Sequence, residues 1–490
     1  MGPGVGRARA VGQAVSPVEV HVSLVGRDEL TVEIYRQLRQ AILEDRLRAG
    51  ERLPPTRELA RRLGVSRTTV TLAYEQLADE GYVHARVGAG TFVSGHVEAY
   101  PSRVRPAGGA LRPRPVWIGI PVPTGFRQPA EFDFRVGMPD ARSFPYQVWR
   151  RLLGKGLDAA VGLGVYAAPA GHPGLRQAVA RHLGAARAVQ AAAEDVVITS
   201  GTQQALDLVA RVLLEPGDQV AVEDPGYAPT WLLFEALGTK VAGVPLDDEG
   251  LVVDAIPKGT RLVYVTPSHQ FPLGMTMSLP RRLALLAWAR RHDAAIVEDD
   301  YDSEFRYGGR PVEPLQTLDM GGRVVYVGSF SKTMLPSLRL GFLVAPASLR
   351  EALRAAKYVT DWHTPLPEQV ALARFIDEGW FARHVRKMRA VYQARHQRLL
   401  DGLATELAEH LEVVPSAVGL HVTAIARTAS SGDLDVVVAL ASAAGVEVLP
   451  VRRYALGSSI PPGLVFGYGA IPTDRIAEGL HRLRRSFDSH

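Results

Sequence analysis

The chain has 490 residues, 47% of them hydrophobic and 22% charged, and it contains no cysteine. This composition is typical of a globular protein with about two to four domains, and it excludes disulfides, thiolate catalysis and cysteine-ligated metal centres. The net charge of +5 is uneven, because residues 1–130 carry a balance of +6 and the rest of the chain −1. The excess favours an anionic partner near the N-terminus, although solvated arginines would explain it equally well.

Shifts in composition divide the chain into four segments. Residues 1–26 are expected to form a flexible arm, 27–96 a helix-rich domain, 97–131 a linker rich in proline and arginine, and 132–490 one large domain. The chain has neither an apolar stretch long enough to cross a bilayer nor an N-terminal secretory signal. We therefore expect a cytoplasmic protein without a membrane partner.

The helix-rich domain has the pattern of a helix-turn-helix followed by a wing. Apolar spacing predicts a helix over residues 31–43, and two short helices are joined by Gly64-Val65-Ser66, with Ser66 as the N-cap of the second. Residues 82–86 and 91–93 predict two strands around a glycine turn. The second short helix begins with side chains that can contact phosphates or base edges.

The string LPPTRELARRLGVSRTTVTLAYEQLADEGYVHARVGAGTFV, which starts at Leu53, resembles the winged helix-turn-helix of the GntR superfamily. The resemblance implies binding to double-stranded DNA, with Arg67 as the best candidate for reading a base. The alternative is a small helical module that binds another protein. The DNA contacts implied are Arg57, Arg67, Thr68, Thr69, Arg86 and Gly88.

The large domain alternates short apolar runs with amphipathic segments such as residues 280–291. The runs 196–200, 219–223, 261–266, 294–298 and 323–328 read as buried strands. This order predicts an α/β fold, a mostly parallel sheet with helices on both faces. After residue 350 the pattern predicts a smaller α+β subdomain.

Residues with suitable chemistry follow several of these strands. Lys332 lies just after the run 323–328, and a lysine buried at that edge of a sheet can form a Schiff base, although most lysines face solvent. Arg339 and the turn after residue 200 offer a cation and free N–H groups to an anion. Asp299 can hold a proton on a pyridine nitrogen, and Tyr301 can bond a phenolic oxygen.

The order and spacing of these residues resemble the fold-type-I aminotransferases, and so imply pyridoxal 5'-phosphate. On that resemblance Lys332 is the catalytic residue and bonds the cofactor, while Asp299 pairs with the pyridine nitrogen and Tyr301 with the ring hydroxyl. Arg453 would bind the carboxylate of an effector, with the adjacent Arg452 as an alternative. The remaining cofactor contacts implied are Gly201, Thr202, Gln203, Ser329 and Arg339 for the phosphate, Tyr227 stacked on the ring, and Tyr166 reaching the phosphate of a partner subunit. Core packing is the alternative role for Tyr227 and Tyr166.

One stretch departs from the aminotransferase pattern. Aminotransferases have an asparagine that bonds the cofactor ring oxygen, whereas residues 266–274 read TPSHQFPLG, so His269 or Gln270 would have to replace it. The strings SHQFPLG, EDDYDSEF and SFSKTMLPSLRLGF are similar to the MocR subfamily of GntR regulators. That resemblance implies a head-to-tail homodimer that binds a promoter with two half-sites.

Three functions remain open from the sequence. We expect a transcription regulator whose DNA binding responds to pyridoxal phosphate, alone or joined to a small amino compound, with vitamin B6 or amino-compound metabolism as target. The alternatives are a working aminotransferase that carries an autoregulatory DNA-binding module, and a cofactor reservoir with a vestigial winged helix. No metal site is expected.

Overall fold

The computed structural model describes residues 22, 30–94, 111–122, 130–161, 164, 166–309, 312–457 and 460–489. Contacts divide the chain into two compact units, Met1–Pro113 and Arg114–His490, and this division falls inside the predicted linker. Most of the predicted arm and part of the linker lie outside the described residues. Within the described ranges, no helix combines the length and apolar character that crossing a membrane requires.

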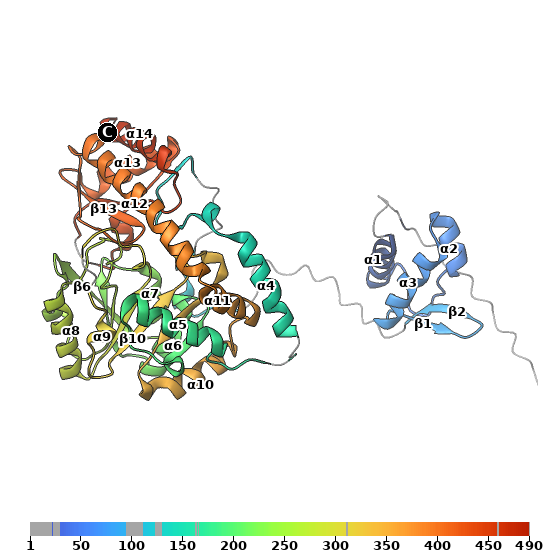
Figure 1. The fold of residues 1–490 in the computed structure, drawn as a ribbon. Coiled ribbons are helices and arrows are strands. Elements are labelled where there is room, and N and C mark those ends of the chain that lie inside the picture. Colours follow the sequence, from blue (N-terminus) through green and yellow to red (C-terminus); the bar gives the residue numbers. More distant parts are fainter. Residues whose placement is uncertain are drawn as a thin grey trace, which may run out of the picture. The chain divides into compact units, whose positions relative to one another are not determined.

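The described part of the N-terminal unit has three helices followed by a two-stranded antiparallel sheet (Figure 1). Ser66 accepts a hydrogen bond from Thr69 N and begins the third helix, as predicted, and Gly64 ends the second helix with a φ of 66°. The helices enclose a core that includes Ile34, Leu38, Leu59, Val70 and Leu77. The elements are α1 (Leu30–Leu43), α2 (Thr56–Leu63), α3 (Arg67–Asp79), β1 (Val83–Arg86) and β2 (Gly90–Val93).

The C-terminal unit is built on an eight-stranded sheet of order β4-β11-β10-β9-β8-β5-β6-β7. β5, β6, β8, β9 and β10 run parallel, whereas β11 and β7 run antiparallel to their neighbours. All five predicted strands are present. The strands are β4 (Val196–Thr199), β5 (Gln219–Asp224), β6 (Lys240–Asp247), β7 (Gly250–Leu251), β8 (Thr260–Val265), β9 (Ala295–Asp300), β10 (Val324–Ser329) and β11 (Gly341–Val344).

Helices cover both faces of this sheet, which confirms the predicted α/β fold. On one face, Val197, Val222, Tyr264, Val297 and Val327 pack in one cluster with α6 (Thr202–Leu213), α7 (Ala228–Ala236) and α10 (Arg350–Asp361). The strand residues that alternate with these point to the other face of the sheet and pack there, where α5 (Pro173–Arg187) and α8 (Leu279–His292) lie. Successive side chains of a strand point to opposite faces, so neighbouring residues at the strand ends enter different environments.

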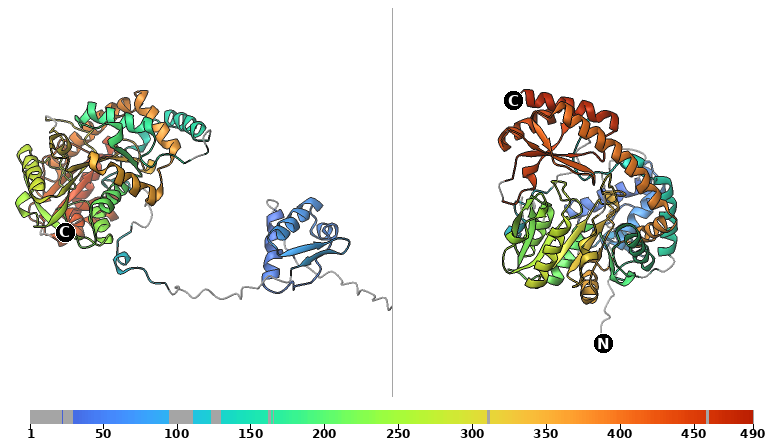
Figure 2. Two further views of the ribbon diagram at one scale, coloured as in Figure 1. Left: turned by 90° about the horizontal axis from the view of Figure 1, so that it is seen from below. Right: turned by 60° about the vertical axis from the view of Figure 1, so that its left-hand side comes forward.

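A smaller subdomain follows α12 (Trp380–Glu406), as predicted, and gathers at one end of the unit (Figures 1 and 2). Its sheet has the order β12-β13-β16-β15, and β14 pairs with β3 near the start of the unit. The strands are β3 (Phe132–Asp133), β12 (Leu411–Val413), β13 (His421–Ala426), β14 (Val446–Glu447), β15 (Leu449–Pro450) and β16 (Gly463–Gly467). The remaining helices are α4 (Tyr146–Val161), α9 (Leu315–Leu318), α11 (Leu366–Asp377), α13 (Ser431–Ala443) and α14 (Ile476–Asp488).

Candidate functional site

Lys332 lies in the loop after β10, at the carboxyl edge of the parallel strands. Its Nζ donates a hydrogen bond to the Gly137 carbonyl oxygen at 2.9 Å and forms no ion pair with the described residues. Burial lowers the pKa of the Lys332 amine, while the negative charges of Asp302 and Asp299 oppose this shift. A partly buried amine without a bonded carboxylate is suited to act as a nucleophile.

Asp299 is buried near the end of β9, on the same face of the sheet as Tyr264 of the neighbouring β8. Its Oδ2 accepts a hydrogen bond from the Tyr264 hydroxyl at 2.8 Å, and its Oδ1 has no partner among the described residues. Burial raises the pKa of Asp299 to about 7, and the bond from Tyr264 opposes that rise. The free oxygen therefore has the capacity to accept a proton from a ligand.

Glu298 and Asp300 flank Asp299 in sequence and point to the opposite face of β9. Glu298 accepts bonds from two backbone amides of α9, and Asp300 accepts from Arg187 at 2.9 Å and from Tyr326 at 2.6 Å. Both carboxylates are thus held within the protein. Asp300 Oδ1, like Asp299 Oδ1, has no partner among the described residues, but Asp300 lies on the opposite face of the sheet.

Tyr301 and the loop after β8 lie beside these groups. The Tyr301 hydroxyl donates to the His269 carbonyl oxygen at 2.8 Å. The Gln270 side chain is occupied by its own surroundings, because its amide donates to the carbonyl oxygens of Pro225 and Phe271 and its oxygen accepts from Leu273 N. The structure therefore gives Gln270 no free donor for a ligand ring oxygen.

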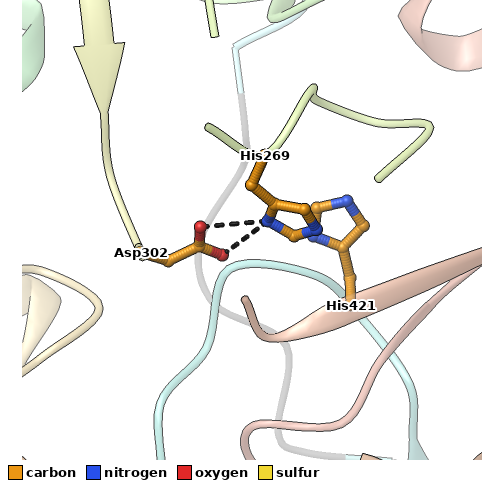
Figure 3. A group of neighbouring side chains, drawn as sticks. All are labelled: His269, Asp302 and His421. Carbon is orange, nitrogen blue, oxygen red and sulfur yellow. Dashed lines mark hydrogen bonds and ion pairs between the residues drawn. The ribbon is translucent and has the colours of Figure 1, made fainter. Parts of the chain in front are cut away.

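His269 belongs to a buried cluster with Asp302 and His421 (Figure 3). Its Nδ1 lies 3.0 Å from both Asp302 oxygens, while His421 Nε2 donates to the Pro272 carbonyl oxygen at 3.0 Å. The two imidazoles face each other, with ring centroids 4.3 Å apart and planes tilted by 33°. A β-carbon on Gly419 would lie 2.1 Å from the His269 ring, so this glycine allows the cluster to close.

The turn between β4 and α6 forms a candidate anion seat. Gly201 is the N-cap of α6, with a φ of 85°, and the first N–H groups of that helix point out of its N-terminus. A β-carbon on Gly201 would lie 2.8 Å from Arg339 NH2, which donates to the Ser200 carbonyl oxygen at 2.7 Å. Thr202 and Gln203 form the first turn of α6, and Ser329 lies at the end of β10.

The buried side chain of Lys357 supports the turn that forms this anion seat. Gln204 Oε1 accepts hydrogen bonds from Ser200 N at 2.8 Å and from Lys357 Nζ at 2.7 Å. Lys357, which has no exposed surface, also contacts Asp361 and Thr364. The sequence gives no sign of this role for Lys357, because a single lysine in an amphipathic helix ordinarily faces solvent.

Aromatic rings surround the loop at Phe271. The Phe271 ring packs edge-on against Tyr227 at 5.9 Å, Tyr301 at 6.3 Å and Tyr454 at 4.9 Å between centroids. Phe271 precedes the second proline of the TPSHQFPLG stretch, and its side chain offers a ligand no hydrogen bond. The sequence analysis named Tyr227 as a cofactor contact but not Phe271 or Tyr454, since an isolated aromatic residue in a sequence usually indicates a side chain of the hydrophobic core.

Arg452 and Arg453 differ in their partners. Arg452 forms an ion pair with Asp435 of α13, whereas Arg453 is exposed and forms no ion pair within the ranges that the structure covers. The segment that carries both is fastened to the large sheet, because Gly226 N donates to the Tyr454 carbonyl oxygen and Leu456 N donates to Asp224, each at 2.9 Å. Arg453 is therefore available to bind an anion.

Tyr166, like Arg339, is a predicted cofactor residue that the structure leaves exposed. It is 72% exposed and stacks on Trp362 with ring centroids 4.3 Å apart. Core packing, the alternative considered from the sequence, is excluded by this exposure.

The predicted DNA contacts lie in the N-terminal unit. Arg57, Arg67, Thr68, Arg86 and Gly88 are exposed. Thr69 is less accessible, because its hydroxyl lies 2.8 Å from Ser66 Oγ within the helix cap, and the Arg86 guanidinium stacks 5.0 Å from the centroid of the Phe92 ring.

The C-terminal unit fits pyridoxal phosphate on three counts. Lys332 provides an amine without a bonded carboxylate, and Asp299 provides a buried oxygen without a partner. Gly201 leaves at the N-terminus of α6 a space that a β-carbon would fill, lined by Arg339. These features suit an aldehyde, a pyridine nitrogen and a phosphate respectively.

Comparison with known proteins gives a match for each unit. Residues 30–93 match the gntR family of bacterial regulatory proteins, and residues 134–464 match class I and II aminotransferases. The larger unit is similar to the crystal structure of Pyrococcus horikoshii kynurenine aminotransferase, with a TM-score of 0.67 and 29% sequence identity, over 73% of this chain and 91% of that one. The aminotransferase fold implies binding of pyridoxal phosphate.

Several relatives match both units together. The chain is 38% identical over 461 residues to the probable rhizopine catabolism regulatory protein MocR of Rhizobium meliloti, with 93% of each chain covered. It is 30% identical to the pyridoxine biosynthesis transcriptional regulator PdxR of Corynebacterium glutamicum, over 91% of this chain and 93% of the relative. This chain therefore belongs to the MocR-type GntR regulators, transcription regulators in which a winged helix-turn-helix precedes an aminotransferase-like domain.

Proposed function

We propose that this regulator binds a promoter through its winged helix and senses pyridoxal phosphate, alone or joined to an amino compound, through its aminotransferase-like unit. The observation that carries the proposal is the partly buried Lys332 amine in the same site as the unpartnered oxygen of Asp299. When bound, the cofactor supplies an aldehyde that reacts with amines and a ring that withdraws electrons. Regulation requires that the bound ligand have different affinities for two states of the protein.

Each side chain has a defined part in this proposal. Lys332 would provide the amine for the cofactor aldehyde, Asp299 would hold a proton at the pyridine nitrogen, and the Tyr301 hydroxyl, now bonded to the His269 carbonyl oxygen, would be a donor for the ring oxygen. His269 and Gln270 contribute indirectly, because their side chains hold the loop that carries Phe271. The remaining proposed cofactor contacts are Gly201, Thr202, Gln203, Ser329 and Arg339 at the phosphate and Tyr227 at the ring face.

We further propose that the effector binds through a carboxylate at Arg453, since Arg452 is neutralised by Asp435. The names of the two relatives suggest genes of vitamin B6 or amino-compound metabolism as targets. The exposed Tyr166 supports a head-to-tail homodimer in which this residue reaches the partner's phosphate, and two-fold symmetry would then place two half-sites on the promoter. The proposed domains remain residues 27–96 and 132–490, joined by 97–131 and preceded by an arm.

A working aminotransferase is the second candidate. It is favoured by the same Lys332 and Asp299, together with an Arg453 that lacks a carboxylate partner within the described ranges. The stretch 266–274 weighs against it, because it lacks the asparagine of aminotransferases and the Gln270 amide is already bonded to the carbonyl oxygens of Pro225 and Phe271.

The test is the visible absorption spectrum of the full chain loaded with pyridoxal phosphate and titrated with amino acids and amines. A regulator should show a spectral change that stops without release of a keto acid, or no response to the panel, and Lys332→Ala should lose the adduct that borohydride traps. Formation of a keto acid with full conversion to pyridoxamine phosphate would establish the aminotransferase instead. Trapping of the cofactor on Lys332→Ala protein would refute the site.

A further inference from the structure

Residues 50–53 pair with the free edge of β2 through an isolated β-bridge. Gly50 N donates to the Val93 carbonyl oxygen at 3.0 Å, and Leu53 N donates to the Thr91 carbonyl oxygen at 2.9 Å. Arg52 lies directly opposite Phe92 in this pairing, as His84 does on the other side of β2. Paired residues share a face, so Arg52, Phe92 and His84 lie together on the outer face of the wing while Leu53 is buried on the inner one.

The Arg52 side chain reaches the wing turn. A β-carbon on Gly90 would lie 2.7 Å from Arg52 Nε and 3.2 Å from NH2, so the guanidinium lies against that glycine. Arg86 pairs with Gly90 and stacks on Phe92, which places a second guanidinium on the same face. Arg52 Nε is buried and has no partner in the described part of the unit.

Ion pairs divide the arginines of this unit into two groups. Four of them are neutralised by glutamates at or below 4.0 Å, namely Arg36 by Glu33, Arg39 by Glu80, Arg46 by Glu44 and Arg62 by Glu58. The arginines that form no ion pair with any described residue are Arg48, Arg52, Arg57, Arg61, Arg67 and Arg86, and three of them, Arg57, Arg67 and Arg86, are predicted DNA contacts. Arg52 therefore shares the electrostatic character of the DNA-contact set.

Arg52 also lies between the two parts of the predicted DNA surface. The chain runs from Arg52 through Pro54, whose carbonyl oxygen accepts from Tyr74 of α3, to Thr56 at the start of α2. Arg67 Nε lies 3.5 Å from Thr56 Oγ1, which brings the start of α3 to the same place. A phosphate backbone that passes from α3 to the wing turn would therefore cross the Arg52 guanidinium.

We propose that Arg52 binds a phosphate of double-stranded DNA beside the wing turn, where its guanidinium lies against Gly90. Such a contact adds affinity without sequence preference, because a phosphate carries no base information. It releases a condensed counterion, so it contributes to the salt dependence of binding. This inference rests on the DNA-binding function of the winged helix and is independent of the cofactor.

The test measures binding of the full chain to a labelled DNA duplex of random sequence by fluorescence anisotropy, over a range of KCl concentrations. The slope is that of log K against log[KCl], where K is the observed association constant for the duplex. Arg52→Gln should make this slope shallower by about 0.9 and weaken binding about eightfold near 0.1 M salt. Arg52→Lys should keep the wild-type slope, because it keeps the charge. Arg36→Gln is the matched control, since Arg36 is already paired with Glu33 on α1, and should leave the slope unchanged.

Two outcomes would overturn the assignment. One is an unchanged slope for Arg52→Gln, and the other is a loss of slope in Arg52→Lys equal to that in Arg52→Gln, which would indicate a packing role. If Arg52→Gln also lowers the melting temperature, the slope measured for Arg52→Lys still distinguishes a phosphate contact from a packing role. Failure of the wild-type chain to bind any duplex would instead refute DNA binding itself, which separates the two failures.

Discussion

Two buried tyrosines donate hydrogen bonds to neighbouring aspartates on opposite faces of β9, and removing each hydroxyl should have a different pH dependence. Tyr264 is a donor to Asp299, whose other oxygen has no partner in the described residues. Tyr326 bonds Asp300, which Arg187 also holds at 2.9 Å. Tyr264→Phe and Tyr326→Phe thus form a matched pair in size, burial and chemistry.

The magnitude follows from the charge of the acceptor. Burial raises the pKa of Asp299 to about 7 from 3.8, so the folded state holds this proton at higher pH than the unfolded chain, and stability falls as pH rises from about 4 to 7. A hydrogen bond is worth about 0.5–1.5 kcal/mol to a neutral acceptor and about 1.5–3 kcal/mol to a charged one. Tyr264→Phe should therefore raise the pKa of Asp299 by about one pH unit.

The assay is urea unfolding of the cofactor-free protein between about pH 5 and pH 9. We expect Tyr264→Phe to cost about 1 kcal/mol at the acid end, where Asp299 is protonated, and about 1.4 kcal/mol more at the alkaline end. Tyr326→Phe should show a constant cost, because Arg187 keeps the pKa of Asp300 below its ordinary value although burial opposes this, and the carboxylate stays charged throughout. A flat profile for Tyr264→Phe, or the same slope in both variants, would refute the reasoning.

Three further substitutions test other parts of the structure. Arg187→Met should lower the free energy of unfolding by about 3–5 kcal/mol in urea titrations, because it leaves the buried Asp300 charge unpaired, and the double variant with Asp300→Asn should recover part of that loss. Ser66→Ala should cost the N-terminal unit about 1 kcal/mol by removing the α3 cap, measured by thermal unfolding, and Ser66→Asp should restore it. Lys357→Met should weaken binding of pyridoxal phosphate, measured by absorbance, because Gln204 loses a donor that helps fix the anion seat, whereas the exposed Lys258→Met should not.

The sequence by itself determined the elements and their order. Apolar runs of strand length and amphipathic helices are local patterns, so β4, β5, β8, β9 and β10 could be located from short windows of sequence. The helices of the winged helix could be located in the same way, because Ser66 caps the start of α3 and Gly64 caps the end of α2, each within one turn of its own position. Lys332 and Asp299 could be named because each directly follows or ends such a strand.

The tertiary structure decided which polar atoms of the site residues have a partner among the described residues and which do not. Lys332 bonds the carbonyl of Gly137, a residue 195 positions away, and Asp299 meets Tyr264 only because β8 and β9 are neighbours in the sheet. The same long-range order neutralises Arg452 through Asp435 and leaves Arg453 available. The alternation of side chains along a strand indicates that Asp299 and its neighbours Glu298 and Asp300 point to opposite faces of the sheet. It does not indicate on which face their hydrogen-bond partners lie. The contacts between distant segments depend on sheet order and side-chain packing, neither of which a local pattern encodes.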